Sequence, residues 1–155
     1  MDLNALKTEL TTDPLGLGYG QLIVDAPGQV VNILNAPKRD TKISSRFVTA
    51  RTVLGETGLI GGSILDALTK AAETQSTVKW ALTFLSQDAG LDVGEPATQY
   101  QINQLEQYAF LTPAQAAALR NLALRPCSRA EKLGLGTVTE ADIRAAMALP
   151  DNGGA

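Results

Sequence analysis

Apolar residues recur at intervals of three and four in a series of short segments, and each segment starts at a helix-capping residue and stops at proline or glycine. In the first segment, Leu3, Leu6 and Leu10 share one helical face. Asp2 can cap this helix, and Pro14 ends it. Later helices are predicted to begin at or near Asp25, Ser44, Ser63, Thr77, Pro96, Thr112, Ser128 and Thr139. The pattern predicts an all-α protein of about eight short helices.

The loops between these helices are rich in glycine and proline. Residues 38–44 are polar and basic, and we expect them to be extended. Residues 55–62 contain several glycines, and we expect a flexible hinge there. We expect one compact helical domain over residues 1–149, in which residues 1–24 form a glycine-rich arm that contacts neighbouring subunits. Residues 150–155 are expected to form a flexible tail.

The composition limits the chemistry that the chain can perform. Its 155 residues suit one domain, and a domain of this size can hold a core without a metal or a disulfide. The chain has no histidine and one cysteine, which excludes Ser–His and Cys–His nucleophile pairs, HExxH zinc sites and an internal disulfide. The carboxylates show no spacing that singles out an acid–base pair. We therefore expect no enzyme activity, no catalytic residues, no cofactor and no metal site.

Hydropathy and charge bear on compartment and partners. The first residues lack a basic stretch followed by an apolar one, so no secretory signal is expected. No run of about 18 uncharged apolar residues predicts a membrane span. The formal net charge of -3 argues against general binding to a nucleic-acid backbone. These features favour a protein of a reducing compartment.

Alternating glycines in residues 15–20 bear a superficial likeness to a phosphate-binding loop. A dinucleotide site would need a preceding strand and an acidic residue about 20 positions on, and a P-loop would need a lysine. A helix ended by proline precedes the segment instead, and no such lysine follows. We therefore expect glycine turns that project Leu15, Leu17 and Tyr19 as anchors into a groove of this subunit or of a neighbour.

A second segment punctuated by glycine carries Leu59 and Ile60. We expect it to order against neighbouring subunits, where the loss of chain entropy is offset by burial of apolar area. Together with the three anchors above, these two residues are the candidate protein-interface residues.

The densest positive cluster consists of Lys38, Arg39, Lys42, Arg46 and Arg51. One interpretation is contact with phosphate or with an acidic partner surface. The other, which we favour, is a solvated connection followed by the polar side of a helix. No aromatic residues alternate with these charges to stack on bases, which weakens an argument for single-strand binding.

Two further features are interpreted as structural. A calcium loop starting at Asp88 would need glycine in place of Val93 and glutamate in place of Gln99, so its carboxylates are expected to cap helix ends. Cys127 has no neighbouring base or resolving cysteine in the sequence, and we expect it to be buried.

Two stretches carry a resemblance to a known group of proteins. The first spans residues 6–19, LKTELTTDPLGLGY, and the second spans residues 128–136, SRAEKLGLG, followed by VTEADI at 138–143. They resemble the N-terminal and C-terminal signatures of small proteins encoded among the structural genes of tailed bacteriophages. The resemblance covers about a third of the chain and supplies no catalytic residues. In those proteins the middle of the chain varies.

The resemblance implies a structural component of a tailed-phage virion, in the tail or neck region, that acts through protein–protein contacts. Such a subunit is expected to be made in the host bacterial cytoplasm, to reside in the virion, and to form a symmetric homo-oligomer or assemble on one with other virion proteins. One alternative is a soluble assembly chaperone for a fibre or tail protein. Another is a small DNA-associated or host-directed regulator that uses the cluster in residues 38–51.

Overall fold

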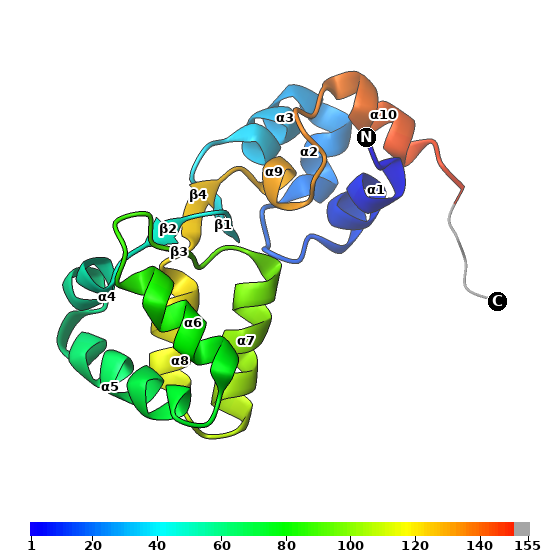
Figure 1. Ribbon diagram of the computed structural model, residues 1–155. Helices are drawn as coiled ribbons and strands as arrows, with labels where there is room; N and C mark the ends of the chain where they lie inside the picture. Colours follow the sequence, from blue (N-terminus) through cyan, green and yellow to red (C-terminus); the bar gives the residue numbers. More distant parts are fainter. Residues whose placement is uncertain (151–155) are drawn as a thin grey trace. The chain divides into compact units, whose positions relative to one another are not determined.

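The chain folds into two compact units, and the computed structural model describes residues 1–150 (Figure 1). Unit 1 is discontinuous and consists of Met1–Thr41 together with the segment that starts at Pro126, whereas unit 2 is Lys42–Arg125. Each unit has its own hydrophobic core, and the two cores share no residue. The expectation of one compact domain is therefore corrected. The expected tail, residues 150–155, lies almost entirely outside the described residues.

The expected all-α class is also wrong, although the protein is mainly helical. Helices account for 61% of the structure, and the described residues form ten α-helices and four short strands in two small sheets. The strands are two to four residues long, too short for an alternating pattern to show in the sequence. The extended conformation expected within residues 38–44 is confirmed, because Asp40–Ile43 forms strand β1.

Five helices make up unit 1. They are α1 (Leu3–Thr12), α2 (Tyr19–Asp25), α3 (Pro27–Asn35), α9 (Arg129–Lys132) and α10 (Glu140–Met147). Helix α1 packs against α10 and α2, and α3 packs against α2, α9 and α10. Residues 1–24, expected to be an arm, are thus part of a folded unit. The buried residues of its core are Leu6, Leu10, Tyr19, Val30, Leu34, Ala130, Leu135, Val138, Ile143 and Ala146.

Local capping explains where several of these helices begin. The Asp2 carboxylate accepts hydrogen bonds from the backbone N–H groups of Asn4 and Ala5, both at 3.0 Å, at the start of α1. The Ser128 hydroxyl accepts from the first turn of α9, and Thr139 forms a capping box at the start of α10. The caps predicted at these three positions are confirmed.

Unit 2 holds the other helices and one small sheet. In chain order its elements are β2 (Phe47–Val48), α4 (Ala50–Glu56), the 3-10 turn η1 (Gly58–Ile60), α5 (Gly61–Ala72), α6 (Ser76–Leu85), β3 (Leu91–Asp92), α7 (Pro96–Gln107) and α8 (Pro113–Asn121). Helix α5 packs against α4 and α6, and α7 packs against α8. Strands β2 and β3 pair antiparallel, with Phe47 opposite Asp92 and Val48 opposite Leu91.

The predicted helix that was to start at Ser44 or Ser45 begins later. Residues from Phe47 form strand β2, and α4 starts at Ala50 behind a capping box made by Thr49 and Thr52. Pairing with β3, more than forty positions along the chain, keeps this segment extended.

The β2–β3 sheet depends on close backbone approach. A Cβ atom at Gly94 would overlap the Ser44 carbonyl group, and one at Gly90, whose φ is +74°, would lie 2.5 Å from the Val48 oxygen. The Asp92 carboxylate accepts hydrogen bonds from the Ser45 hydroxyl at 2.6 Å and from the backbone N–H of Gly94. It therefore links the segment before β2 to the segment that contains β3. Positions 90 and 94 therefore require glycine, because the neighbouring backbone leaves no room for a side chain.

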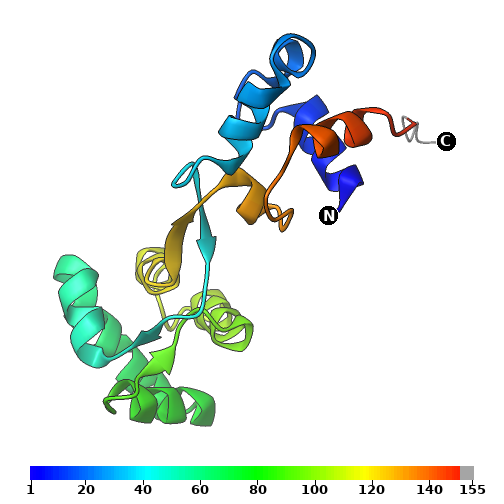
Figure 2. The same cartoon turned by 90° about the horizontal axis from the view of Figure 1, so that it is seen from above.

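Strand β1 pairs with β4 (Leu124–Cys127), and the division between the two units falls within both strands. Figures 1 and 2 show these strands side by side, β1 in cyan and β4 in gold. Unit 2 is therefore an insertion into unit 1 whose first and last residues belong to paired strands.

Candidate functional site

The loop between α1 and α2 is organised around one carboxylate. Asp13 ends α1 in the left-handed conformation, with φ of 40°. Its carboxylate accepts hydrogen bonds from the backbone N–H groups of Leu17 and Gly18, both at 2.7 Å. The bond from Leu17 is the main cause that lowers the pKa of Asp13. Because the carboxylate occupies these N–H groups, the loop does not offer them to a phosphate.

The alternating glycines have a conformational role in this loop. Gly16 and Gly18 both have positive φ, +63° and +79°, which side chains disfavour. The loop thereby leads into α2, with Gly18 as its N-cap residue, and delivers Tyr19 into the core of unit 1.

Tyr19 was expected to be an anchor in a groove of its own subunit or of a neighbouring subunit. In the structure it lies in its own subunit. Its side chain is fully buried in unit 1, where its hydroxyl donates a hydrogen bond of 3.3 Å to Glu9 Oε1. Burial, followed by the charge of Glu9, raises the pKa of Tyr19 far above its ordinary value. Tyr19 is therefore not an exposed interface residue, because its own chain provides the groove.

Glu9 also belongs to a buried ionic network. Arg129 donates two hydrogen bonds to the two oxygens of Glu9, at 2.9 and 2.7 Å, and a third from Nη1 to Asp40 Oδ2 at 2.8 Å. The side chains of Glu9 and Arg129 are only 3% and 12% exposed. Arg129 lowers the pKa of Asp40, and Glu9 in turn raises the pKa of Arg129. We call Tyr19, Glu9, Arg129 and Asp40 the unit 1 network.

The network joins two stretches that lie far apart in the sequence, residues 6–19 and residues 128–136. Glu9 and Tyr19 come from the first stretch and Arg129 from the second, 120 residues away from Glu9. The second stretch also has two glycines of positive φ, Gly134 at +69° and Gly136 at +70°. The two stretches are thus in contact and belong to the same core, that of unit 1.

The other predicted interface residues are at least partly exposed. The side chain of Leu15 is half exposed and that of Leu17 is partly buried against the core of unit 1. In unit 2, Leu59 is fully exposed at the centre of η1, and Ile60 is partly buried against the core. These four positions stay predicted interface residues.

The basic cluster is divided between the units. Lys38 and Arg39 belong to unit 1, whereas Lys42, Arg46 and Arg51 belong to unit 2. Arg46 is engaged within unit 2, since its guanidinium donates to Glu56 Oε1 at 2.6 Å and to the backbone oxygen of a buried leucine at 2.9 Å. The cluster is therefore not one surface of a single unit.

The remaining candidates serve the fold. The Ser45 hydroxyl is the main cause that lowers the pKa of Asp92, and Cys127 is buried in unit 1. Within residues 1–150, no group of three potential metal-ligating side chains gathers at one place. No helix in that range is long and apolar enough to cross a bilayer.

Sequence reasoning missed a set of exposed aromatic side chains on unit 2. Large aromatic side chains that are 47% exposed or more all lie in this unit: Phe47, Trp80, Phe84, Tyr100 and Tyr108. The available signal was the spacing of Trp80 and Phe84, which lie four residues apart at the margin of the apolar stripe of α6. Aromatic side chains are enriched at protein interfaces.

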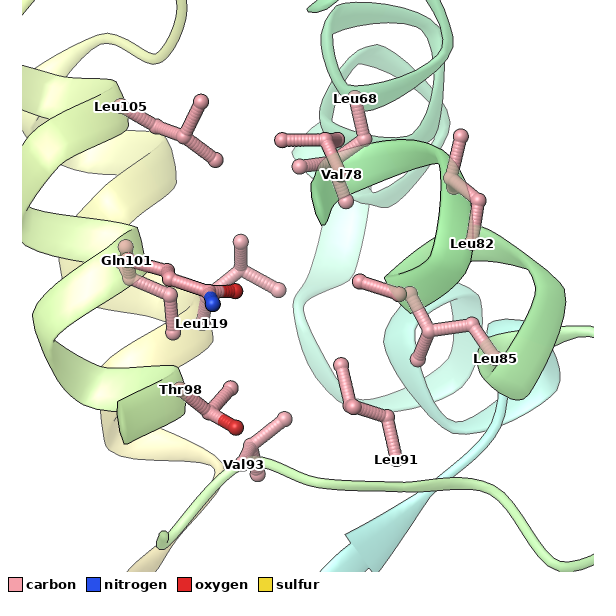
Figure 3. Close-up of a pocket in the computed structure, with 12 residues that line it drawn as sticks. Leu68, Val78, Leu82, Leu85, Leu91, Val93, Thr98, Gln101, Leu105 and Leu119 are labelled. Carbon is pink, nitrogen blue, oxygen red and sulfur yellow. The ribbon is translucent and has the colours of Figure 1, made fainter. Parts of the chain in front are cut away.

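Sequence reasoning also missed an apolar cavity inside unit 2. Figure 3 shows it between α6, which contributes Val78, Leu82 and Leu85, and α7, which contributes Thr98 and Leu105. Its volume is about 40 Å³. A space of this size, lined by core residues, is a small packing void.

Comparison of the chain with family models, with curated proteins and with solved structures finds no match.

Proposed function

We propose that this protein is a structural component of a tailed-bacteriophage virion, in the tail or neck region, and that it works through protein–protein contacts. The observation that carries the proposal is the convergence of the two resembling stretches in unit 1, where Glu9 and Arg129 form a buried ion pair. The two resembling stretches build one core together. This favours the view that unit 1 is a frame shared with the phage proteins and that it binds the same kind of partner.

The position of unit 2 supports the same proposal. It lies between the two stretches in the sequence, in the part of the chain that varies among the phage proteins. It also carries the exposed aromatic side chains and the fully exposed Leu59. In this proposal, unit 1 attaches the subunit to the particle, and unit 2 presents a surface that differs from phage to phage.

The proposal assigns no catalysis to the chain. The carboxylates of Glu9, Asp13, Asp40 and Asp92 all bind donors of the chain itself. Groups engaged in this way stabilise a fold and are poorly placed to exchange protons with a substrate. A protein that contributes shape and contact surface needs no such group.

The test is the protein content of the purified particle. Virions of the phage that encodes this chain should contain it at a fixed ratio to the other tail or neck proteins when they are analysed by mass spectrometry. A chaperone would be abundant in the infected cell and missing from the particle, and that result would contradict the proposal. Electron microscopy of the same virions, with an antibody against unit 2, should then place the label at the tail or neck.

A pair of variants tests whether Leu15 takes part in attaching the subunit to the particle. Leu15→Asp in unit 1 should reduce incorporation into virions, because it puts a charge on a half-exposed apolar anchor. Thr8→Asp, on the exposed side of α1, is the matched control, and it should be incorporated as the unaltered chain is. Equal incorporation of both variants would remove Leu15 from the attachment surface and leave the virion assignment to mass spectrometry.

A further inference from the structure

A hollow of unit 2 lies between the start of α6 and the C-terminal half of α7. Gln75 and Thr77 line it from the first side, and Gln101, Gln104 and Tyr108 line it from the second. Its volume is about 220 Å³, several times the roughly 30 Å³ that one water molecule occupies in the liquid. The hollow is therefore large enough for a small organic group, such as a six-membered ring with its substituents.

The hollow offers apolar surface as well as polar groups. Val78 and Leu105 are buried core residues that also line it, and Figure 3 shows them on opposite sides of the space between α6 and α7. Tyr108 follows the last residue of α7 and is 66% exposed. An aromatic ring held at the edge of such a site can lie flat against an apolar face of a ligand.

Several polar side chains of the lining have no hydrogen-bond partner within residues 1–150. They belong to Gln75, Thr77, Gln101 and Tyr108. Figure 3 shows the Gln101 amide pointing from α7 into the space between α7 and α6. Solvent still reaches these groups, because no buried side-chain nitrogen or oxygen in that range lacks a partner. They are therefore available to a ligand that takes the place of water.

The hollow is uncharged. None of the residues that line it within residues 1–150 is an acid or a base. Glu106, the acidic residue of α7 between Gln104 and Tyr108, is paired with Arg120 at 2.6 Å. A charged ligand would lose hydration in the hollow without gaining a counter-charge. The lining therefore favours a neutral ligand.

The hydrogen-bonding chemistry of the lining narrows the class of ligand. Glutamine amides and the hydroxyls of threonine and tyrosine both donate and accept hydrogen bonds. Sugar hydroxyls do the same, and the C–H groups of a sugar ring form an apolar face that suits the ring of Tyr108. A peptide main chain has separate donors and acceptors along an extended line, whereas Gln101 and Tyr108 are separated by only about 10 Å of helix. A sugar therefore fits this site better than a peptide does.

We propose that this hollow binds one ring of a neutral oligosaccharide. The amides of Gln75 and Gln101 bind the hydroxyls of the ring, and Tyr108 lies against its apolar face. Tyr100 is 63% exposed and shares one face of α7 with Gln104 and Tyr108, at steps of four residues. Each step rises about 6 Å along the helix, so Tyr100 can contact a further ring of the same oligosaccharide. The inference goes beyond the proposed function and does not rest on it, because it concerns the purified chain alone.

The first experiment is a titration of the full-length chain followed by NMR of its side-chain amide groups. The probes are three neutral trisaccharides: maltotriose, cellotriose and chitotriose. At least one of them should shift the amide signals of Gln75 and Gln101, with a Kd of about 1 mM, as expected for a few neutral hydrogen bonds and one aromatic contact. Trigalacturonic acid carries a carboxylate on each ring and should give no shifts.

Two results of this titration would overturn the inference. One is the absence of shifts with all three neutral probes at concentrations about tenfold above the expected Kd. The other is a shift of the same signals by an uncharged proline-rich peptide and by none of the trisaccharides, which would assign the hollow to a peptide.

The second experiment tests the aromatic contact. Tyr108→Ala should weaken binding of the best probe about tenfold, because it removes the ring that covers the sugar face. Tyr108→Phe keeps the ring and should lose less. The matched control is Phe84→Ala, which removes an exposed aromatic ring near the other end of α6 and should bind as the unaltered chain does. Equal losses in Tyr108→Ala and Phe84→Ala would contradict a site at this hollow.

The third experiment tests the amide. Gln101→Leu keeps the size of the side chain and removes its donor and its acceptor, so binding should weaken about fivefold to tenfold. Gln87→Leu is the matched control, because Gln87 is exposed and lies outside the hollow. Unchanged binding by Gln101→Leu would show that the amide does not contact the sugar and would overturn the inference. Virions that contain the chain would still support the proposed function.

Discussion

Unit 1 and unit 2 solve the same packing problem in different ways. Unit 1 buries its aromatic residue, Tyr19, and closes its core with an ion pair between Glu9 and Arg129. Unit 2 has an apolar core that contains a cavity, and it leaves its aromatic side chains mostly at the surface. A buried ion pair requires one arrangement of its partners, whereas exposed aromatic side chains are available for new contacts. The contrast fits the proposal that unit 1 is the fixed frame that attaches the subunit and that unit 2 presents a variable contact surface.

The strongest way to break this contrast is to remove Arg129. Arg129→Ala leaves Glu9 buried without a cation and should lower the free energy of unfolding of unit 1 by about 3–5 kcal/mol. Unit 2 should be unaffected if the units unfold independently. Trp80, the single tryptophan, lies in unit 2, so its fluorescence reports unit 2 while circular dichroism reports both units during denaturation.

The control for that experiment is an ion pair of the same unit that is exposed. Arg144 and Glu140 lie 3.2 Å apart on the surface of α10. Arg144→Ala should change stability by no more than about 1 kcal/mol. A loss as large as that of Arg129→Ala would show that burial of the pair is not what matters.

The next effect in size tests unit 2 alone. Gly94→Ala places a methyl group where the Ser44 carbonyl lies, and the β2–β3 sheet must shift to accept it. We expect the free energy of unfolding of unit 2 to fall by about 1–3 kcal/mol. Trp80 fluorescence should then change at a lower denaturant concentration. Gly55→Ala is the matched control, because nothing lies within 4 Å of its Cβ position, and it should keep the stability of unit 2 or raise it. An unchanged transition in Gly94→Ala would contradict the close approach at this sheet.

Acid should unfold unit 1 before unit 2. The pKa values of Asp13, Asp40 and Asp142 in unit 1 lie below the ordinary 3.8, mainly because of bonds from Leu17, from Arg129 and from Thr139. Unit 2 has one such group among the described residues, Asp92. A lowered pKa in the folded state gives stability that is present above about pH 4 and is lost as the pH falls through the folded value.

The measurement is a titration from neutral pH to pH 2, followed by circular dichroism and by Trp80 fluorescence. The helical signal of unit 1 should fall at a higher pH than the fluorescence changes. Coincident transitions would mean that the two units unfold together or that the aspartates of unit 1 contribute no more than that of unit 2.

The smallest effect comes from a matched pair of glycines inside helices. Gly20 in α2 and Gly62 in α5 have open space at the Cβ position. Alanine at either position should stabilise its own unit by about 0.5–1 kcal/mol, because it restricts the unfolded chain. Denaturation curves should show the gain only in the unit that carries the change, and a gain shared by both units would refute their independence.

Local features of the fold could be predicted from the sequence, whereas features that depend on distant residues could not. The caps at Asp2, Thr112 and Thr139 were predicted because a cap needs only the next three residues. The strands and the two units were not predicted, because residues 44–123 separate β1 from β4 along the chain.

The same distinction applies to the candidate site. In the sequence Glu9 looks like the solvated side of an amphipathic helix, and Arg129 looks like a charge at a helix end. The two residues lie 120 positions apart in the sequence, and only their contact in the structure shows that they are buried partners. Leu59 is fully exposed and Ile60 is partly buried, and their place at an interface stays a prediction. The cavity left no local signal, since its lining residues are the same stripes that predict a filled core.

The paired strands β1 and β4 also bear on how such a chain can diversify. Because unit 2 begins and ends on neighbouring strands, genetic exchange between Ile43 and Leu124 can replace one insert with another and leave the parental scaffold able to close. The paired strands thus reduce what unit 1 requires of an insert to one condition, that its two ends lie side by side.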